Sequence, residues 1–376
     1  MADIFDYLRW RGDIPFDADP FNEVDNLILA ELSYTSFDGI VDAGSGKKSL
    51  KEACERYFEI HSRDDIKEDS SHIKRAPLLM DGMLSGKRFE SVLLTHYVDI
   101  VSTDKDMQIA ALTYLLPDGS AYIAFRGTDD TIVGWKEDFN MSYLPETEGQ
   151  RSAVRYLNEA GKRTRGPLRA GGHSKGGNFA VYAAAFCDRA VQDRITDVYT
   201  SDGPGFRSAV MKSEGYRRIL PRVTGIVPDT SIIGMLLTSR VKHVTVKSSK
   251  RGWAQHDPMT WQIERNRFEQ AEQSALGLFI SESQREWLSG LDDESRESFV
   301  NTLFTMLEAT GVDTFEEMKG KKLKALERMR SSINGMPKEK QDEFMEIIGA
   351  LLQSGRRVAR NTLTQSLNKE RDDERK

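Results

Sequence analysis

A serine stands between two pairs of glycines in the stretch Ala170 to Ala184, AGGHSKGGNFAVYAA. The five residues from Gly172 to Gly176 fit the pattern Gly-x-Ser-x-Gly, with Ser174 at the centre. This pattern is typical of a sharp strand-to-helix turn, where a Cβ at either glycine would collide with the neighbouring strand or helix. It predicts that Ser174 is a nucleophile held at the turn. A structural glycine-rich loop is the alternative.

The residues on both sides of Ser174 fit the strand and the helix that such a turn needs. The run PLRA precedes the glycines, and the small-residue run GNFAVYAAAFC follows them. A helix formed by the second run would lie close to a sheet and would point its N-terminus at Ser174. That orientation favours negative charge developing at the serine.

Strand and helix patterns alternate from about residue 96 to residue 268, which predicts an α/β fold. Pro117 and Gly119 mark a hairpin between two apolar runs, because proline presets φ and glycine permits a positive φ. The later strand patterns are separated by helical ones, as in parallel sheets with helical crossovers. We therefore expect a mixed, mostly parallel sheet, with helices of the first 90 residues covering it.

Beyond about residue 268 the strand patterns stop, and from residue 281 consecutive amphipathic helical patterns continue to the end of the chain. This change predicts an α/β domain over residues 1–280 and a C-terminal helical extension over residues 281–376. The last dozen residues are polar enough that we expect them to fray. The helices of the extension also offer a surface for self-association or for a partner protein.

The charge and the cysteines exclude several classes of protein. The 53 basic and 59 acidic residues give a net charge of -6, without the positive excess that nucleic-acid binding normally requires. No apolar run approaches the roughly 18 residues of a membrane span, and the N-terminus has no secretory signal pattern. Cys54 and Cys187 lie far apart without metal-ligand spacing. We expect a cytoplasmic protein with free thiols, no metal and no organic cofactor.

A nucleophilic serine needs a histidine base and an acid that orients it. In hydrolases with this turn the chain order is serine, acid, histidine. Two histidines follow Ser174, and we favour His256 because His243 lies in the strand-like run VKHVTV. Asp229 and Asp202 each end a predicted strand. We favour Asp229 as the acid and keep Asp202 as the alternative.

The stretch AYIAFRGTDDTIVGWKEDF, residues 121–139, resembles the class 3 lipases, in which an apolar strand ends in Phe-Arg-Gly-Thr and Trp-x-x-Asp follows. Together with GGHSKGG, this resemblance covers about residues 97–261. The runs HSKGGN and SDGPGF and the opening GDIPFDADPFNEVDNLILAELSY look more like the bacterial Mbeg1-like family, lipase-like proteins of poorly defined function. The resemblance implies an α/β-hydrolase fold.

The resemblance also assigns roles to residues near Ser174. It implies that Thr128 and the backbone N–H of Lys175 form the oxyanion hole, although Thr128 as a helix cap is an alternative. We expect Arg126 and Asp138 to form a partly buried pair that supports this loop. The Lys175 side chain is left open between solvent, an anionic substrate and an acid across the pocket.

These features predict a serine esterase or lipase that cleaves a small acyl ester or a lipid. Two other classes remain open: a scaffold or binding protein that has lost turnover, and a thioesterase or peptidase on the same fold. The chemistry of the serine, the histidine and the acid does not by itself choose among acyl groups.

Overall fold

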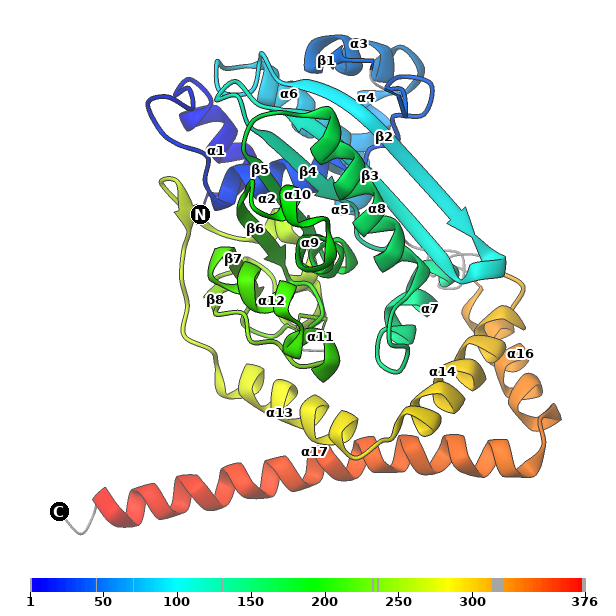
Figure 1. Cartoon of the computed structure of the whole chain (residues 1–376). Coiled ribbons are helices and arrows are strands. Elements are labelled where there is room, and N and C mark those ends of the chain that lie inside the picture. Colours follow the sequence, from blue (N-terminus) through cyan, green and yellow to red (C-terminus); the bar gives the residue numbers. More distant parts are fainter. Residues whose placement is uncertain are drawn as a thin grey trace.

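The structure is a computed structural model, and it describes residues 2–44, 46–69, 71–129, 131–231, 233–234, 237–312 and 321–373. Its centre is an eight-stranded sheet in which the strands lie side by side in chain order (Figure 1). The strands are β1 (Lys48–Ser49), β2 (Leu93–Ser102), β3 (Met107–Leu115), β4 (Ala121–Phe125), β5 (Leu168–His173), β6 (Ile195–Ser201), β7 (Val223–Pro228) and β8 (His243–Val246).

The pairing of the strands confirms the predicted mixed sheet. Strands β1 to β4 pair antiparallel, and each pair from β4 to β8 is parallel. Leu115 pairs with Ala121 at the end of the predicted β3–β4 hairpin. The turn signal at Pro117 and Gly119 therefore marked a real reversal of the chain.

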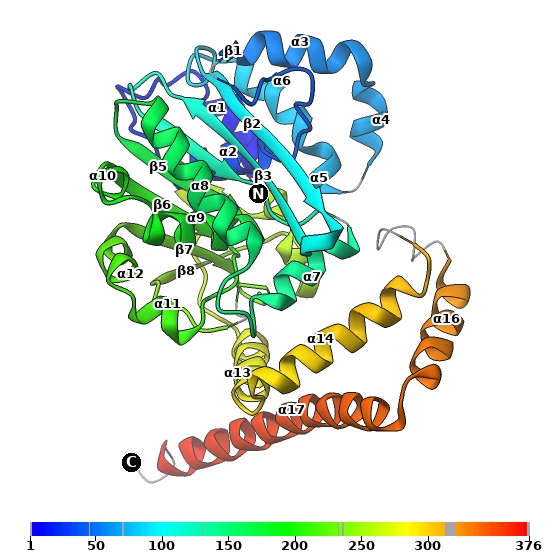
Figure 2. The same ribbon diagram turned by 45° about the vertical axis from the view of Figure 1, so that its right-hand side comes forward.

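Helices cover both faces of the sheet and form a hydrophobic core on each (Figures 1 and 2). The alternating side chains of β3 show the division, since Leu112 belongs to one core and Ile109 to the other. The helices of the N-terminal part of the chain pack against one face; they are α1 (Ile4–Arg11), α2 (Glu23–Leu32), α3 (Leu50–Ile60), α4 (Arg63–Glu68), α5 (His72–Arg75) and α6 (Leu79–Leu84). The helices that follow β4 along the chain are α7 (Ile132–Asn140), α8 (Glu148–Arg163), α9 (Lys175–Phe186), α10 (Arg189–Gln192), α11 (Ser208–Lys212) and α12 (Glu214–Ile219).

Short elements complete the α/β part of the chain. A second sheet pairs β9 (Ile263–Glu264) with β10 (Arg267–Phe268). The 3-10 helices are η1 (Ala76–Leu78), η2 (Thr103–Lys105), η3 (Leu220–Arg222), η4 (Gly252–His256) and η5 (Pro258–Thr260). Cys54 and Cys187 are both buried and are not joined in a disulfide. The predicted α/β-hydrolase fold is confirmed by the parallel strands around a strand-to-helix turn at Ser174.

The C-terminal helices form a third core together with helix α7, which contributes Ile132 and Phe139 (Figure 2). They are α13 (Ala275–Ser289), α14 (Asp293–Glu308), α16 (Lys322–Gly335) and α17 (Lys338–Asp373). The boundary expected after residue 280 falls inside α13. The tail that we expected to fray is helical up to Asp373, and residues 374–376 lie outside the described part. Among the described helices, none has the length and apolar character that a membrane crossing needs.

Candidate active site

Ser174 occupies a strained turn between β5 and α9. Its φ of 56° is in the region that residues with a side chain rarely adopt. A Cβ on Gly172 would overlap the backbone of Gly176, and a Cβ on Gly176 would overlap the carbonyl group of Phe125. The Gly-x-Ser-x-Gly pattern therefore has the steric cause that the sequence suggested. Ser174 is 6% exposed, so its surroundings largely shield it from bulk water.

The elbow, residues 172–176, is tied to the end of the neighbouring strand β6. The Ser174 N–H donates to the carbonyl oxygen of Ser201 at 2.9 Å. The next residue, Asp202, is completely buried and has a φ of 50°. A strand adjacent to β5 thus delivers a carboxylate beside the elbow.

The structure brings His256 to Asp202. The imidazole Nδ1 of His256, at the end of η4, lies 2.6 Å from one carboxylate oxygen of Asp202. The other oxygen accepts hydrogen bonds from the Ser231 hydroxyl and, at 3.2 Å, from the Gly234 N–H. These contacts fix the orientation of the carboxylate and assign Nδ1 of the ring to it.

Asp229, which we favoured as the acid, does not contact this histidine. Its carboxylate accepts the N–H of Ser274 at 2.5 Å, immediately before helix α13. Asp229 follows β7, one strand further from the elbow than β6, and its carboxylate lies at the start of α13. Of the two candidate aspartates, Asp202, the alternative, is therefore the one that contacts His256. His243 begins β8, within the strand that its alternating pattern predicted.

His173 connects the loop of His256 to the elbow. Its side chain is completely buried, and its Nε2 donates to the backbone carbonyl of His256 at 2.9 Å. The two imidazole rings lie 4.6 Å apart between their centroids. Burial, followed by the nearby His256 and His72, lowers the pKa of His173 well below its usual value. A neutral His173 with its proton on Nε2 fits these contacts.

The loop after β4 lies against the elbow from the other side. A Cβ on Gly127 would be 3.0 Å from the Cβ of Ser174. The next residue, Thr128, donates its hydroxyl to the Asp138 carboxylate of helix α7. Burial raises the pKa of Asp138 to about 6. The second oxygen of Asp138 is buried without a hydrogen-bond partner among the described residues.

The predicted pair between Arg126 and Asp138 is wrong. The Arg126 guanidinium binds both carboxylate oxygens of Asp99, on strand β2, at 2.6 and 2.9 Å. It also lies 3.8 Å from Asp129. Asp138 instead accepts from the Thr128 hydroxyl. The sequence missed Asp99 because β2 is far from the Phe-Arg-Gly-Thr motif along the chain and meets it only through strand β3.

The Lys175 side chain pairs with an acid, which is one of the three environments that the sequence left open. Its ammonium group is completely buried and lies 3.2 Å from a carboxylate oxygen of Glu137, which is equally buried. It also contacts Gln108 and the carbonyl of Gly134. The lysine side chain is therefore neither in solvent nor on the substrate side. Its backbone N–H stands in the first turn of α9, where helix N–H groups lack intrahelical partners.

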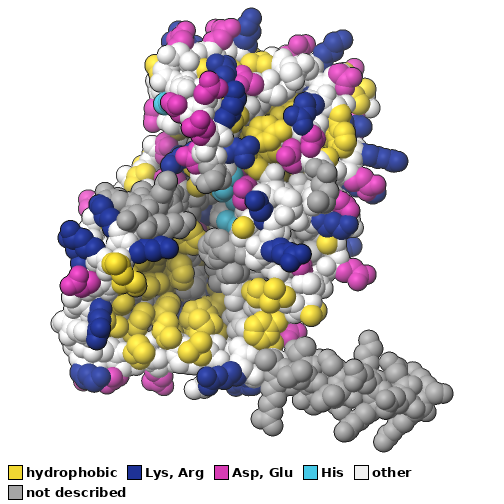
Figure 3. Space-filling model, turned by 180° about the vertical axis from the view of Figure 1, so that it is seen from behind, with side chains coloured by type: hydrophobic (Ala, Val, Ile, Leu, Met, Phe, Trp, Pro, Cys, Tyr) yellow, Lys and Arg dark blue, Asp and Glu magenta, His cyan; other side chains and the backbone are white. Residues whose placement is uncertain are grey.

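The surface near these residues is hollowed and partly apolar. Figure 3 shows histidine side chains inside a hollow, with hydrophobic side chains gathered on the side of the C-terminal helices. A cavity of about 30 Å³, with room for about one or two water molecules, lies beside Asp138. Its lining includes Asp138 and Phe139 from α7, Pro204 from the loop after β6, and Trp287 and Phe299 from α13 and α14. Apolar side chains from two parts of the chain thus meet next to Asp138.

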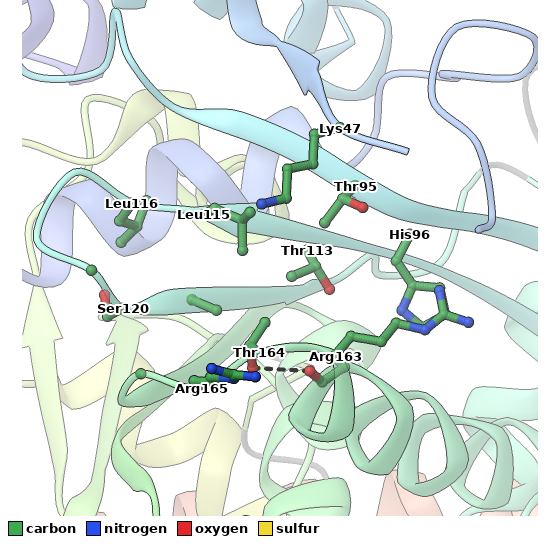
Figure 4. A pocket seen from close by; sticks show the side chains of 14 residues that line it. Lys47, Thr95, His96, Thr113, Leu115, Leu116, Ser120, Arg163, Thr164 and Arg165 are labelled. Atoms are coloured by element: carbon green, nitrogen blue, oxygen red, sulfur yellow. Dashed lines mark hydrogen bonds between the residues drawn. The ribbon is translucent and has the colours of Figure 1, made fainter. Parts of the chain in front are cut away.

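A second cavity, of about 320 Å³, lies at the other end of the strands (Figure 4). Lys47, Thr95, His96 and Arg163 line it, together with the β3–β4 hairpin. None of the residues predicted for catalysis borders this cavity. In parallel sheets, ligands bind beyond the carboxyl ends of the strands, which is where Ser174 lies. We therefore place the candidate active site at the elbow.

Comparison with known proteins assigns this chain to a family. A model of the Mbeg1-like family matches residues 83–305, more than half of the 376 residues. No curated protein matches the chain. The M37 lipase structure is 14% identical, with 56% of this chain and 68% of that chain covered and a TM-score of 0.36. The native propeptide complex of Rhizomucor miehei lipase is also 14% identical, with coverages of 55% and 73% and a TM-score of 0.34.

Proposed function

The chain belongs to the Mbeg1-like family, and from the site that this member carries we propose that it is a serine hydrolase of carboxylic acyl esters. Ser174, His256 and Asp202 would form its catalytic triad. The observation that carries the proposal is the 2.6 Å contact between the His256 imidazole and the buried Asp202 carboxylate, beside a serine at a strained turn.

The proposed reaction assigns one role to each residue. Ser174 attacks the ester carbonyl, and the Nε2 atom of His256 takes the hydroxyl proton because Nδ1 is bonded to Asp202. The same proton then passes to the leaving alcohol, and an acyl-enzyme remains. A water molecule, activated by His256 in the same way, releases the acid. Asp202 stabilises the imidazolium that forms in each half of the reaction.

Backbone N–H groups would stabilise the tetrahedral intermediate. The Thr128 hydroxyl already donates to Asp138, so its backbone N–H is the group that we assign to the oxyanion. The N–H of Lys175 joins it at the start of α9, where the helix dipole also favours negative charge. Removing one such donor typically lowers kcat by about 100- to 1000-fold. The buried Lys175–Glu137 pair would hold α7 and α9 in register.

The apolar side chains beside Asp138 support an apolar acyl group better than a charged one. Phe139, Trp287 and Phe299 border a cavity of about 30 Å³ there, which is too small for an acyl chain, so these side chains would have to move apart to admit one. Small acyl esters and lipids both carry such a group. The proposal therefore extends to an ester with an apolar acyl chain.

A fluorophosphonate probe tests the proposal, because it reacts covalently only with an activated serine. The wild-type protein should be labelled, and Ser174→Ala should not be. Ser289→Ala serves as the matched control, since Ser289 is exposed on α13 and should leave labelling unchanged. Absence of labelling in the folded wild-type protein, together with no turnover of p-nitrophenyl esters, would favour the scaffold alternative.

A further inference from the structure

A group of side chains that can bind a metal lies around His173, at the end of β5. Glu31 of α2, His72 of α5 and His173 of β5 each offer one ligand atom, and these atoms lie within 4.8 Å of one another. Glu31 and His173 are completely buried, and the His72 side chain is 14% exposed. Three elements that are distant in sequence thus bring one carboxylate and two imidazoles together.

The protonation of His173 makes one contact in this group unfavourable. Its Nε2 faces the carbonyl oxygen of His256, so Nε2 carries the proton and Nδ1 carries a lone pair. That Nδ1 lies 3.5 Å from Oε1 of Glu31, which is buried without a hydrogen-bond partner among the described residues. The Tyr34 hydroxyl, 3.2 Å from that Nδ1, can donate to it, so Oε1 of Glu31 is the atom of this contact left without a partner among the described residues, and a buried polar atom without a partner is costly.

A metal ion between these atoms would give Oε1 of Glu31 a partner and would replace the Tyr34 hydroxyl at Nδ1 of His173. We propose that Glu31, His72 and His173 form a zinc site that supports the active site. Zinc takes histidine nitrogen and carboxylate oxygen at about 2.0 to 2.2 Å, so two tetrahedral ligands are about 3.3 Å apart. Nδ1 of His72 lies 2.9 Å from Oε2 of Glu31, Nδ1 of His173 lies 3.5 Å from Oε1, and one ligand atom from each residue lies within 4.8 Å of the others. Small side-chain movements would complete the coordination.

The partner of the second His173 nitrogen strengthens the assignment. A histidine that binds a metal commonly donates its other N–H to a backbone carbonyl or a carboxylate, which fixes the ring. His173 does this with the carbonyl of His256. The Tyr34 hydroxyl lies 3.2 Å from Nδ1 of His173 and competes for the same lone pair. It would turn aside when zinc binds, and water would take the fourth position.

The burial of the ligands assigns this zinc a structural role. Three side chains and a water are the ligand set that catalytic zinc commonly has, but His173 and Glu31 are completely buried, so a substrate would not reach this ion. By holding His173, the ion would hold the backbone of His256. The binding itself does not depend on the reaction at Ser174, whereas this support of catalysis rests on the proposed function.

Zinc titration of the full-length protein, stripped with a chelator, tests the site. Isothermal calorimetry should show one equivalent of zinc bound to the wild-type protein, and zinc should raise its melting temperature. Cobalt(II) in place of zinc should give the visible absorption of a low-symmetry site. His72→Gln and Glu31→Gln should each weaken binding by at least about 100-fold, since losing a ligand costs more than losing its second-shell partner.

Control variants separate this site from other histidines and from catalysis. His61→Gln changes an exposed histidine near the same region and should bind zinc as the wild type does. Ser174→Ala should also keep full zinc binding, so that failure of the esterase proposal leaves this result intact. If His72→Gln does not fold, Glu31→Gln decides. The inference is overturned if the wild type binds no zinc or cobalt, or if His72→Gln binds them as tightly as His61→Gln.

Discussion

The replacement Asp202→Asn tests whether Asp202 sets the protonation of His256, the proposed base, without changing the shape of the site. Asparagine tolerates the φ of 50° at this position as well as aspartate does. The Gly234 N–H is a donor only, so the oxygen of the new side-chain amide must stay on that side. The amide NH₂ then points at Nδ1 of His256. Because Nδ1 must accept this hydrogen bond, the ring proton is held on Nε2. A ring protonated at Nε2 cannot take the proton of Ser174.

The size of the effect follows from the loss of the correct tautomer. In a Ser-His-Asp triad the equivalent change lowers kcat by about 10,000-fold, and at about 1.4 kcal/mol per factor of ten this is roughly 5 kcal/mol of activation free energy. Hydrolysis of p-nitrophenyl butyrate under single-turnover conditions measures it. Thermal melting shows that the variant is folded, which is needed because Asp202 is completely buried.

Asp229→Asn is the matched control. Its amide oxygen can still accept the N–H of Ser274, so this variant should keep the wild-type kcat. The assignment of the acid fails if Asp202→Asn stays within about tenfold, or about 1.4 kcal/mol, of the wild type. It fails equally if Asp229→Asn is the variant that loses activity.

Three further predictions concern the support of the site. Gly176→Ala places a Cβ against the last carbonyl of β4 and should lower the free energy of unfolding by about 1–3 kcal/mol in urea titrations. Arg126→Ala removes the charged partner of Asp99, which keeps only the Tyr97 hydroxyl as a side-chain donor among the described residues, and should cost up to about 3–5 kcal/mol. Arg267→Ala removes an exposed pair and should cost less than about 1 kcal/mol, and equal losses in the two variants would contradict the role of Arg126. Burial raises the pKa of Asp138 from 3.8 to about 6, so the folded state binds this proton more tightly than the unfolded state. This contribution to the free energy of unfolding, up to roughly 3 kcal/mol, is fully present below the unfolded pKa and is lost as the pH rises to about 6. Urea denaturation of the wild type and of Asp138→Asn over this pH range should show the difference.

Local patterns predicted the parts of the site that lie close together in the sequence. The glycines at positions 172 and 176 are needed by the turn that contains Ser174, and a five-residue motif carries all of that information. His256 followed from chain order, because His243 belonged to a strand. The hairpin and the alternation of strands and helices were also local, which explains why the fold was predictable.

Side-chain pairs that the fold brings together from distant parts of the sequence were not predictable. Whether Asp202 or Asp229 reaches His256 depends on how the loops after β6 and β7 leave the sheet, and both aspartates end a strand. Arg126 meets Asp99 across three strands, and Lys175 meets Glu137 between two helices. The sequence offered one signal for the last pair, a lysine beside a nucleophile at a position that lipases often fill with an apolar residue.

The proposed zinc ligands show the same limit more strongly. Glu31, His72 and His173 belong to three segments with no common motif, and the two cysteines take no part. The sequence analysis therefore expected no metal. The packing of α2 and α5 against the end of β5 is what makes the cluster visible.

Helix α7 packs between the candidate active site and the C-terminal helices. One side of it supplies Asp138 to Thr128 and Glu137 to Lys175, and the other side supplies Ile132 and Phe139 to the core of the C-terminal helices. Removing the C-terminal helices would therefore expose the side of α7 that is covered by them, and α7 carries the contacts to Thr128 and Lys175. A molecule that binds the C-terminal helices would, through this single helix, alter the rate of the proposed hydrolysis.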